Sequence, residues 1–144
     1  MRRLAWLLLL VAAPAAQAGE FRSVAETAAL MYDAPSAKAG KLFIASRYYP
    51  VEVIVSVDNW LKVRDASGEL AWVEKKSLSD KRTVLVMAAL ADVRQRAEDS
   101  APVAFQVRQG VALEVAEVAA GPWVKVRHRD GQTGYVRANQ VWGL

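Results

Sequence analysis

The sequence predicts an all-β fold arranged as two small domains in tandem. Two observations lead to this prediction: the chain repeats itself once, and each copy consists of short apolar strands separated by turn residues. A chain of 144 residues has room for one ordinary domain or for two very small ones. The repeat favours two, and it predicts a first domain at residues 19–80 and a second at residues 81–144.

The repeat is clearest around two tryptophans. Residues 60–73 read WLKVRDASGELAWV and residues 123–136 read WVKVRHRDGQTGYV, with six of 14 positions identical at an offset of 63. Upstream, Val51 aligns with Val111 at an offset of 60, which predicts a turn three residues longer in the second copy. Turns accept such insertions more readily than strands do. The two copies therefore share one chain path.

Each strand of the first copy has its own signal. Residues 51–57 alternate strictly, with valines on one face, which indicates a strand with one buried side. Asp58-Asn59 supplies the turn into a strand at residues 60–65, and a Gly-containing turn leads into a strand at residues 71–74. The second copy repeats these strands at residues 111–118, 123–128 and 134–137. Strands of this length and spacing are typical of a small barrel or sandwich.

Alternation along these strands also predicts the core. Side chains at successive strand positions point to opposite faces. Val63 and Val73 in the first copy, and Val126 and Val136 in the second, are therefore expected to point inward, away from the charged residues between them.

One segment argues for a helix instead. Residues 87–98 are rich in Ala, Leu, Arg, Gln and Glu, which have high helix propensity. The repeat, however, aligns this segment with residues 28–35, where Pro35 and the turn residues after it disfavour a long helix. We therefore predict strand and loop at both places.

The first 18 residues predict a signal peptide. Arg2 and Arg3 precede an apolar run at residues 4–13, and Ala16-Gln17-Ala18 forms an A-x-A cleavage site. The apolar run is too short for a membrane-spanning helix, which needs roughly 20 residues. The alternative is a retained N-terminal anchor. Cleavage after Ala18 predicts a soluble, periplasmic protein.

Composition narrows the function further. The chain has no cysteine, which excludes disulfides, zinc thiolate sites and lipid attachment through a cysteine. Removing Arg2 and Arg3 leaves 17 basic against 15 acidic residues, a balance that gives little support to a nucleic-acid partner. The sequence predicts no nucleic-acid binding and no cofactor.

A catalytic site is not indicated either. His128 is the only histidine, with Asp130 or Glu117 as candidate acids nearby. A single histidine at the edge of a turn is more often a surface residue than a general base. No nucleotide-binding glycine motif is present, and one histidine with scattered carboxylates does not make a metal site. We predict a non-enzymatic protein.

The repeated pattern resembles the C-terminal half of bacterial SH3 domains: a Trp, a Lys-Val pair, a Gly-containing turn and a final aromatic-Val. Residues 30–36, LMYDAPS, are similar to the opening strand and first long loop of that family. Tyr49-Pro50 and Gln109-Gly110 stand where the family has a turn glycine, and Ala71 replaces the glycine kept as Gly134. The resemblance implies two tandem SH3-like barrels of about five strands each. It also implies non-catalytic modules linked to peptidoglycan or to envelope proteins.

Aromatic and basic residues at matching positions of the two copies form the candidate ligand-binding set. In the first copy, alternation places a Trp, a Lys and an Arg on one strand face, with a second aromatic on the neighbouring strand. The candidates are Trp60, Lys62, Arg64 and Trp72 in the first copy and Trp123, Lys125, Arg127 and Tyr135 in the second. Because Trp60 and Trp123 share a face with cations, we expect both to be partly exposed. The alternative is that each Trp covers the end of its barrel and the cations form a solvated face.

Two functions fit these observations. The first is a binding module that recognises peptidoglycan or another cell-wall component. The second is a periplasmic adaptor that docks an extended peptide or a partner domain from an envelope protein. The sequence does not separate them.

Overall fold

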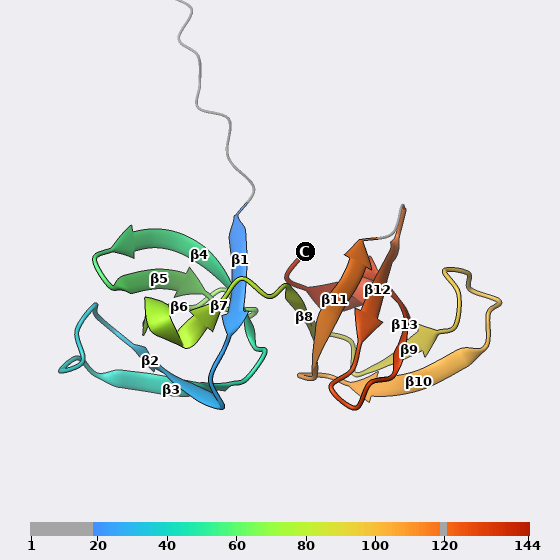
Figure 1. The fold of residues 1–144 in the computed structure, drawn as a ribbon, viewed down its shortest axis with the longest axis horizontal. Coiled ribbons are helices and arrows are strands. Elements are labelled where there is room, and N and C mark those ends of the chain that lie inside the picture. The colour runs from blue at the N-terminus through green and yellow to red at the C-terminus, as the bar shows by residue number, and fades with distance from the viewer. Residues whose placement is uncertain (1–18, 119–120) are drawn as a thin grey trace, which may run out of the picture.

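Figure 1 shows the chain in a computed structural model, which describes residues 19–118 and 121–144. The predicted signal peptide at residues 1–18 lies outside the described residues. The described strands form two antiparallel sheets of seven strands each, and the only helices in these two ranges are two three-residue 3-10 turns. The all-β prediction is therefore confirmed. No helix in the described part of the chain is long and apolar enough to cross a membrane.

The first sheet, which we call barrel 1, has the strand order β3-β2-β6-β5-β4-β1-β7. Its elements are β1 (Glu20–Val24), β2 (Ala28–Tyr32), β3 (Lys41–Ser46), β4 (Pro50–Val57), β5 (Trp60–Arg64), β6 (Leu70–Glu74), η1 (Lys75–Ser77) and β7 (Leu78–Ser79). The strand count exceeds the expected five because β1 and the two-residue β7 also join the sheet. Their pairing, Ser23 with Ser79, brings the two ends of the barrel together.

The second sheet, barrel 2, repeats this topology in the order β10-β9-β13-β12-β11-β8-β14. Its elements are β8 (Thr83–Val86), β9 (Leu90–Arg94), β10 (Val103–Arg108), β11 (Ala112–Val118), β12 (Trp123–Arg127), β13 (Thr133–Arg137), η2 (Ala138–Gln140) and β14 (Val141–Trp142). The terminal strands pair as in barrel 1, with Val141 opposite Val86. Each sheet curves around its own interior, and the two lie side by side (Figure 1).

Each barrel encloses a separate apolar core. The four valines predicted to point inward are confirmed: Val63, Val73, Val126 and Val136 are all at most 1% exposed. The buried partners in barrel 1 include Val24, Ala29, Met31, Val51 and Leu61. Those in barrel 2 include Val84, Val86, Ala91, Val93 and Leu113. Cores of this size leave small domains only marginally stable, so contacts between the barrels carry weight.

The segment with helical propensity is strand and loop, as predicted. β9 begins at Leu90, and Ala91 and Val93 are fully buried while the residues between and after them are not. β9 pairs with β10 on one side and with β13 on the other. Burial of alternate side chains and two sets of strand pairing outweigh the intrinsic helix preference of the segment.

The strict alternation predicted across residues 51–57 is wrong beyond Val53. The pairing register between β4 and β5 shifts between Val53 and Val55, which is the mark of a β-bulge. An extra unpaired residue, Ile54, changes which face the following side chains occupy. Val55 and Val57 consequently lie on the outside, 44% and 40% exposed.

The predicted offset of 60 between the upstream halves of the copies is also wrong. Arg22 pairs with Val51 in barrel 1, and Val84 pairs with Leu113 in barrel 2, so equivalent residues are 62 apart. At the tryptophans the offset is 63 as predicted. The turn between β11 and β12 is therefore one residue longer than its counterpart, not three. Segments rich in Ala and Val align almost equally well at several offsets, and only strand pairing distinguishes them.

In the corrected alignment, Gly110 of barrel 2 is the equivalent of Tyr48 of barrel 1. The Tyr48 N–H donates to the Val24 carbonyl at 2.9 Å, and the Gly110 N–H donates to the Val86 carbonyl at 2.8 Å. Both residues have positive φ, 71° for Tyr48 and 86° for Gly110. Barrel 1 thus has a tyrosine at a left-handed position that barrel 2 fills with glycine.

The barrels are joined by a short linker, Asp80 to Arg82, and by direct contacts. Thr83, 1% exposed, donates its hydroxyl hydrogen bond to the Tyr48 carbonyl oxygen at 2.6 Å. The rings of Phe21 in barrel 1 and Trp142 in barrel 2 pack edge to face with centres 5.3 Å apart. These contacts hold one side of barrel 1 against the start and end of barrel 2.

Candidate functional site

The candidate residues of barrel 1 lie together on the outer face of the β5–β6 hairpin. In its register Lys62 stands directly opposite Trp72, and Trp60 stands opposite Glu74. Trp60, Lys62 and Trp72 are half-buried, and Arg64 is exposed at the far end of β5. Directly opposite side chains in an antiparallel pair lie close enough to interact. The hairpin therefore presents two tryptophans beside two cations, as the sequence predicted.

Tyr32, which was not among the candidate residues, joins this surface. It ends β2, pairs with Trp72 across the β2–β6 ladder, and packs edge to face against Trp60 with ring centres 5.3 Å apart. Its side chain is largely buried, so it supports Trp60 rather than contacting solvent. Neither the repeat nor alternation could indicate it, because the equivalent residue in barrel 2 is Arg94.

The candidate residues of barrel 2 occupy the same positions on the β12–β13 hairpin. Lys125 stands opposite Tyr135, and its ammonium nitrogen lies 6.0 Å from the centre of the Tyr135 ring. That distance is at the outer limit of a cation–π contact. Arg127 is exposed and Tyr135 half-buried. The basic and aromatic pattern is thus conserved in position between the two hairpins.

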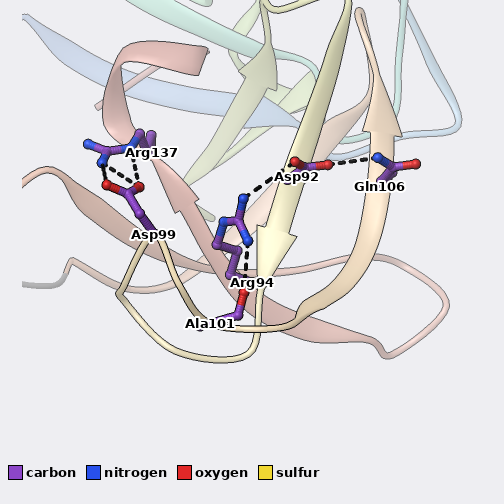
Figure 2. A network of polar contacts seen from close by, with 6 residues as sticks. All are labelled: Asp92, Arg94, Asp99, Ala101, Gln106 and Arg137. Carbon is purple, nitrogen blue, oxygen red and sulfur yellow. Dashed lines mark hydrogen bonds and ion pairs between the residues drawn. The ribbon is translucent and has the colours of Figure 1, made fainter.

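Trp123 differs from this pattern, and the prediction that it is partly exposed is wrong. Only 7% of Trp123 is accessible. The Arg137 guanidinium lies over its ring, 4.9 Å from the ring centre. Asp99 holds Arg137 in place through both carboxylate oxygens, with Nε to Oδ1 at 3.0 Å (Figure 2). We call Asp99 and Arg137 the clamp over Trp123.

The clamp also changes the ionisation of its members. The hydrogen bond from Arg137 lowers the pKa of the Asp99 carboxyl below its ordinary value of 3.8, and the same bond raises the pKa of Arg137. Both groups are therefore charged at neutral pH. In barrel 1, Glu74 occupies the position of Arg137 and lies 3.2 Å from Lys76 instead, so no arginine covers Trp60 there.

Further polar contacts fix the long loop of barrel 2. Arg94 donates to the Ala101 carbonyl at 2.7 Å, and the Gln106 amide donates to the Asp92 carboxylate at 2.7 Å (Figure 2). Asp92 also lies 3.6 Å from Arg94. The Arg94 bond ties the loop that carries Asp99 to β9, and the Asp92–Gln106 bond joins β9 to β10 beside it.

Barrel 1 has apolar residues where barrel 2 has this polar pair. Leu30 and Ile44 face each other across β2 and β3, at the positions of Asp92 and Gln106. Ile44 is 65% exposed, and Leu42 on the same strand is also exposed. β3 stands at one end of the strand order with β2 as its neighbour. Barrel 1 therefore presents an apolar patch on the edge strand β3 and its neighbour β2, defined by Leu30, Leu42 and Ile44.

The only histidine has an acidic neighbour but no further chemical context. His128 Nδ1 lies 3.1 Å from the Asp130 carboxylate, the acid that the sequence indicated first. Hydrogen bonds from Gln132 are the main reason that the pKa of Asp130 is lowered. Within the described ranges no group of three or more His, Asp or Glu side chains could hold a metal ion.

The family of the chain follows from comparison with known sequences. The bacterial SH3 domain family matches twice, at residues 25–80 and 88–143. The chain belongs to this family. The two matches fall on barrel 1 and barrel 2, and the predicted resemblance is confirmed. Bacterial SH3 domains are cell-wall binding modules and are typically extracellular or associated with the envelope. No curated protein sequence matched significantly.

Among solved structures, NlpC2 from Trichomonas vaginalis is similar to the chain at 13% identity and a TM-score of 0.40, covering 89% of this chain and 49% of that one. An NlpC/P60 family protein from Bacillus cereus is similar at 15% identity and a TM-score of 0.39, covering 85% and 55%. The chain spans about half the length of the structures it matches.

The two SH3 domains differ at one packed position of the β6 and β13 strands. A methyl group on Gly134 would lie 2.6 Å from Val93 Cγ1 and 2.7 Å from the Arg94 carbonyl oxygen. Barrel 1 has Ala71 at this position and Met31 at the position of Val93. Methionine is unbranched at Cβ, whereas valine carries two groups there. The unbranched Met31 therefore removes the side-chain overlap that a methyl group meets at this position, one of the two overlaps found at Gly134.

Proposed function

We propose that the protein is an exported, non-catalytic binding module for peptidoglycan or another cell-wall component, and that the outer face of the β5–β6 hairpin in barrel 1 is its main ligand-binding surface. The observation that carries this proposal is the placement of Trp60 and Trp72, both partly accessible, beside Lys62 and Arg64. Membership of the bacterial SH3 domain family supports a cell-wall ligand. The partial exposure of both tryptophans supports this hairpin face as the binding surface.

The chemistry of this surface suits a cell-wall polymer. Tryptophan rings offer large apolar faces that stack on the flat sides of sugar rings or on peptide units, and they commonly dominate binding energy at such surfaces. Lysine and arginine beside them pair with carboxylates. Arg64 already lies 3.4 Å from the Glu52 carboxylate, so Lys62 is the main cation offered to a ligand. The corresponding residues Lys125, Arg127 and Tyr135 in barrel 2 would add weaker contacts because Trp123 is covered.

Retention on purified sacculi tests the surface. Replacing Trp72→Ala should lower retention strongly, whereas Tyr135→Ala at the equivalent position of barrel 2 should lower it less. Lys62→Gln should weaken retention more than Lys38→Gln, a matched loss of one charge on an exposed loop residue. Melting of each variant is measured in parallel. Equal retention by all four variants at equal stability would contradict the proposal.

The proposed location is the periplasm, reached by cleavage after Ala18. The supporting observation is the A-x-A sequence behind a short apolar run. Mass measurement of periplasmic material should give a chain that begins at Gly19. An intact Met1 on membrane-associated protein would show a retained anchor instead.

An adaptor for an envelope protein is the second candidate, and the apolar patch of Leu30, Leu42 and Ile44 favours it. An edge strand offers unpaired backbone groups to an extended peptide, and exposed apolar side chains add affinity. Ile44→Gln, which introduces the residue that barrel 2 has there, should remove protein crosslinks in whole cells while sacculus retention persists. Unchanged crosslinks with this variant would argue against the adaptor function.

A further inference from the structure

A cavity lies at the junction of the two barrels, away from both hairpin faces. Its volume is about 280 Å³. Barrel 1 contributes residues 46–49, and barrel 2 contributes Gly110, Val111 and Ala112 together with the turn that carries His128 and Arg129. An adjoining hollow of about 440 Å³ shares Arg47, Tyr48 and Arg129. Neither barrel alone forms this cavity.

The cavity is basic. Arg47 and Arg129 line it from opposite barrels, and no acidic side chain is among the described residues that line it or the adjoining hollow. The nearest acid is Asp130, whose carboxylate lies 3.1 Å from Nδ1 of the lining residue His128. Among the described residues no carboxylate lies within ion-pair distance of Arg47 or Arg129. Two guanidinium groups against one carboxylate leave a net positive charge around the cavity, which favours an anion.

The rest of the lining is partly apolar. Val111 and Ala112 of barrel 2 and Tyr48 and Tyr49 of barrel 1 are among the lining residues. A bare inorganic anion would leave these surfaces without contact, whereas an organic anion would cover them. The volume is just below the usual lower limit for drug-sized ligands, roughly 300 Å³, which suits one or two amino-acid residues.

Tyr48 is held in an unfavourable backbone conformation at this place. Its φ of 71° lies in the left-handed region, which bulky side chains rarely adopt. The equivalent residue of barrel 2 is Gly110, which adopts the same conformation without strain and lines the same cavity. Strained residues that persist in a fold cluster at functional sites. The Tyr48 ring also lies 5.2 Å from the Lys81 ammonium, which is paired with the Glu114 carboxylate at 3.7 Å.

Hydrogen bonds beside the cavity hold the junction between the barrels in place. Thr83 fixes the Tyr48 carbonyl at 2.6 Å, and the Ser23 hydroxyl donates to the Lys81 carbonyl at 2.7 Å. Arg82 donates to the Gly143 carbonyl at 2.9 Å. A preformed site loses less entropy when a ligand binds.

We propose that this junction is a second binding site, for a small organic carboxylate such as the free C-terminus of a short peptide. Arg47 and Arg129 bind the carboxylate from the two barrels, and the Tyr48 ring with Val111 contacts the apolar body of the ligand. The site is distinct from the β5–β6 face, so it stands or falls independently of the proposed function. It makes the two barrels one binding unit.

A pair of probes tests the ligand class in the purified full-length protein. N-acetyl-alanyl-alanine has a free carboxylate, and its C-terminal amide lacks it. The carboxylate should shift the backbone amide resonances of Tyr48 and Gly110 on titration, and the amide should bind at least about tenfold more weakly, as expected for a lost charge-assisted hydrogen bond. Equal binding of the two probes, or tighter binding of inorganic phosphate than of the dipeptide, would overturn the assignment.

Charge variants test the residues. Arg47→Gln and Arg129→Gln should each lower the affinity for N-acetyl-alanyl-alanine by about tenfold. Arg96→Gln is the matched control, because Arg96 is exposed on the long loop of barrel 2 and pairs with Glu98. An equal loss with Arg96→Gln would show general charge attraction and no site.

Tyr48→Gly separates binding from folding. Relief of the left-handed strain should raise the melting temperature, while loss of the ring should weaken probe binding. A purely structural tyrosine would not give these opposite signs. If the Tyr48→Gly variant is more stable and binds the probe as tightly as the parent protein, Tyr48 is not part of the site. Ligand binding would then not explain the strained conformation of Tyr48.

Discussion

Trp60 and Trp123 begin equivalent strands of equivalent barrels, and they share a sequence context of Trp, apolar residue, Lys, Val and Arg. Their surroundings nevertheless differ. Tyr32 packs edge to face against Trp60 and leaves the Trp60 ring partly exposed to solvent, whereas the clamp of Asp99 and Arg137 covers Trp123. The same tryptophan is thus available to a ligand in barrel 1 and serves as a packing residue in barrel 2.

The β2–β3 and β9–β10 hairpins differ in the same direction. Leu30 and Ile44 leave barrel 1 apolar on its outer face, and Asp92 and Gln106 form a hydrogen bond at those positions in barrel 2. Barrel 2 pairs its polar side chains at these positions with each other, and barrel 1 exposes apolar side chains there. A repeated fold can therefore keep its core in both copies while the two copies expose different side chains at equivalent surface positions.

The largest expected difference between the two barrels is in the stability lost when each tryptophan is replaced by alanine. Trp123→Ala should lower the free energy of unfolding by about 3–5 kcal/mol, because it leaves a cavity under the clamp. Trp60→Ala should cost less, about 1–2 kcal/mol, since part of the ring already faces solvent. Denaturant unfolding, followed by amide signals assigned to each barrel, measures both. Equal losses would mean that the two tryptophans are packed alike.

The Gly134 position gives a smaller effect. Gly134→Ala should destabilise barrel 2 by about 1–3 kcal/mol, because the new methyl group overlaps Val93 and the Arg94 carbonyl. Adding Val93→Met should recover part of that loss, since this pair recreates the Ala71 and Met31 arrangement of barrel 1. A double-mutant cycle in thermal melting measures the coupling. If the stability losses of Gly134→Ala and Val93→Met simply add, the two positions are not coupled in the way proposed for Ala71 and Met31.

The smallest effect concerns pH and the clamp. Asp99 has a lowered pKa in the folded protein, so its contribution to stability is complete above its ordinary pKa of 3.8 and disappears as the pH falls through the lower folded value. Tryptophan fluorescence should therefore change in that acidic range as Arg137 is released from Asp99. Asp99→Asn should abolish this transition, and its persistence in that variant would assign the change to another carboxyl.

Much of the fold could be predicted because it depends on local pattern. The Trp-Lys-Val repeat located the hairpins, and strand alternation identified Val63, Val73, Val126 and Val136 as core residues. Alternation failed at Val55 and Val57 because a bulge changed the period within one strand. A bulge is set by pairing with the neighbouring strand, and no residue type in β4 marks it.

The candidate surface was predictable in its position and unpredictable in its accessibility. The outward placement of Lys62 and Trp72 followed from a period of two along a strand. The burial of Trp123 depends on Asp99, which is 24 positions away along the chain and reaches Arg137 only when the long loop folds back. Sequence reasoning had no means of pairing these two residues.

Sequence by itself determined the fold class, the duplication and the inward face of each central strand, because these follow from short-range periodicity and from chemistry that repeats along the chain. Tertiary structure alone decided which tryptophan stays open, that Tyr48 and Gly110 occupy the same left-handed position, and that the loops of both barrels meet around one basic cavity. Those features arise from contacts between residues far apart in sequence, and their energies depend on distance and orientation in space.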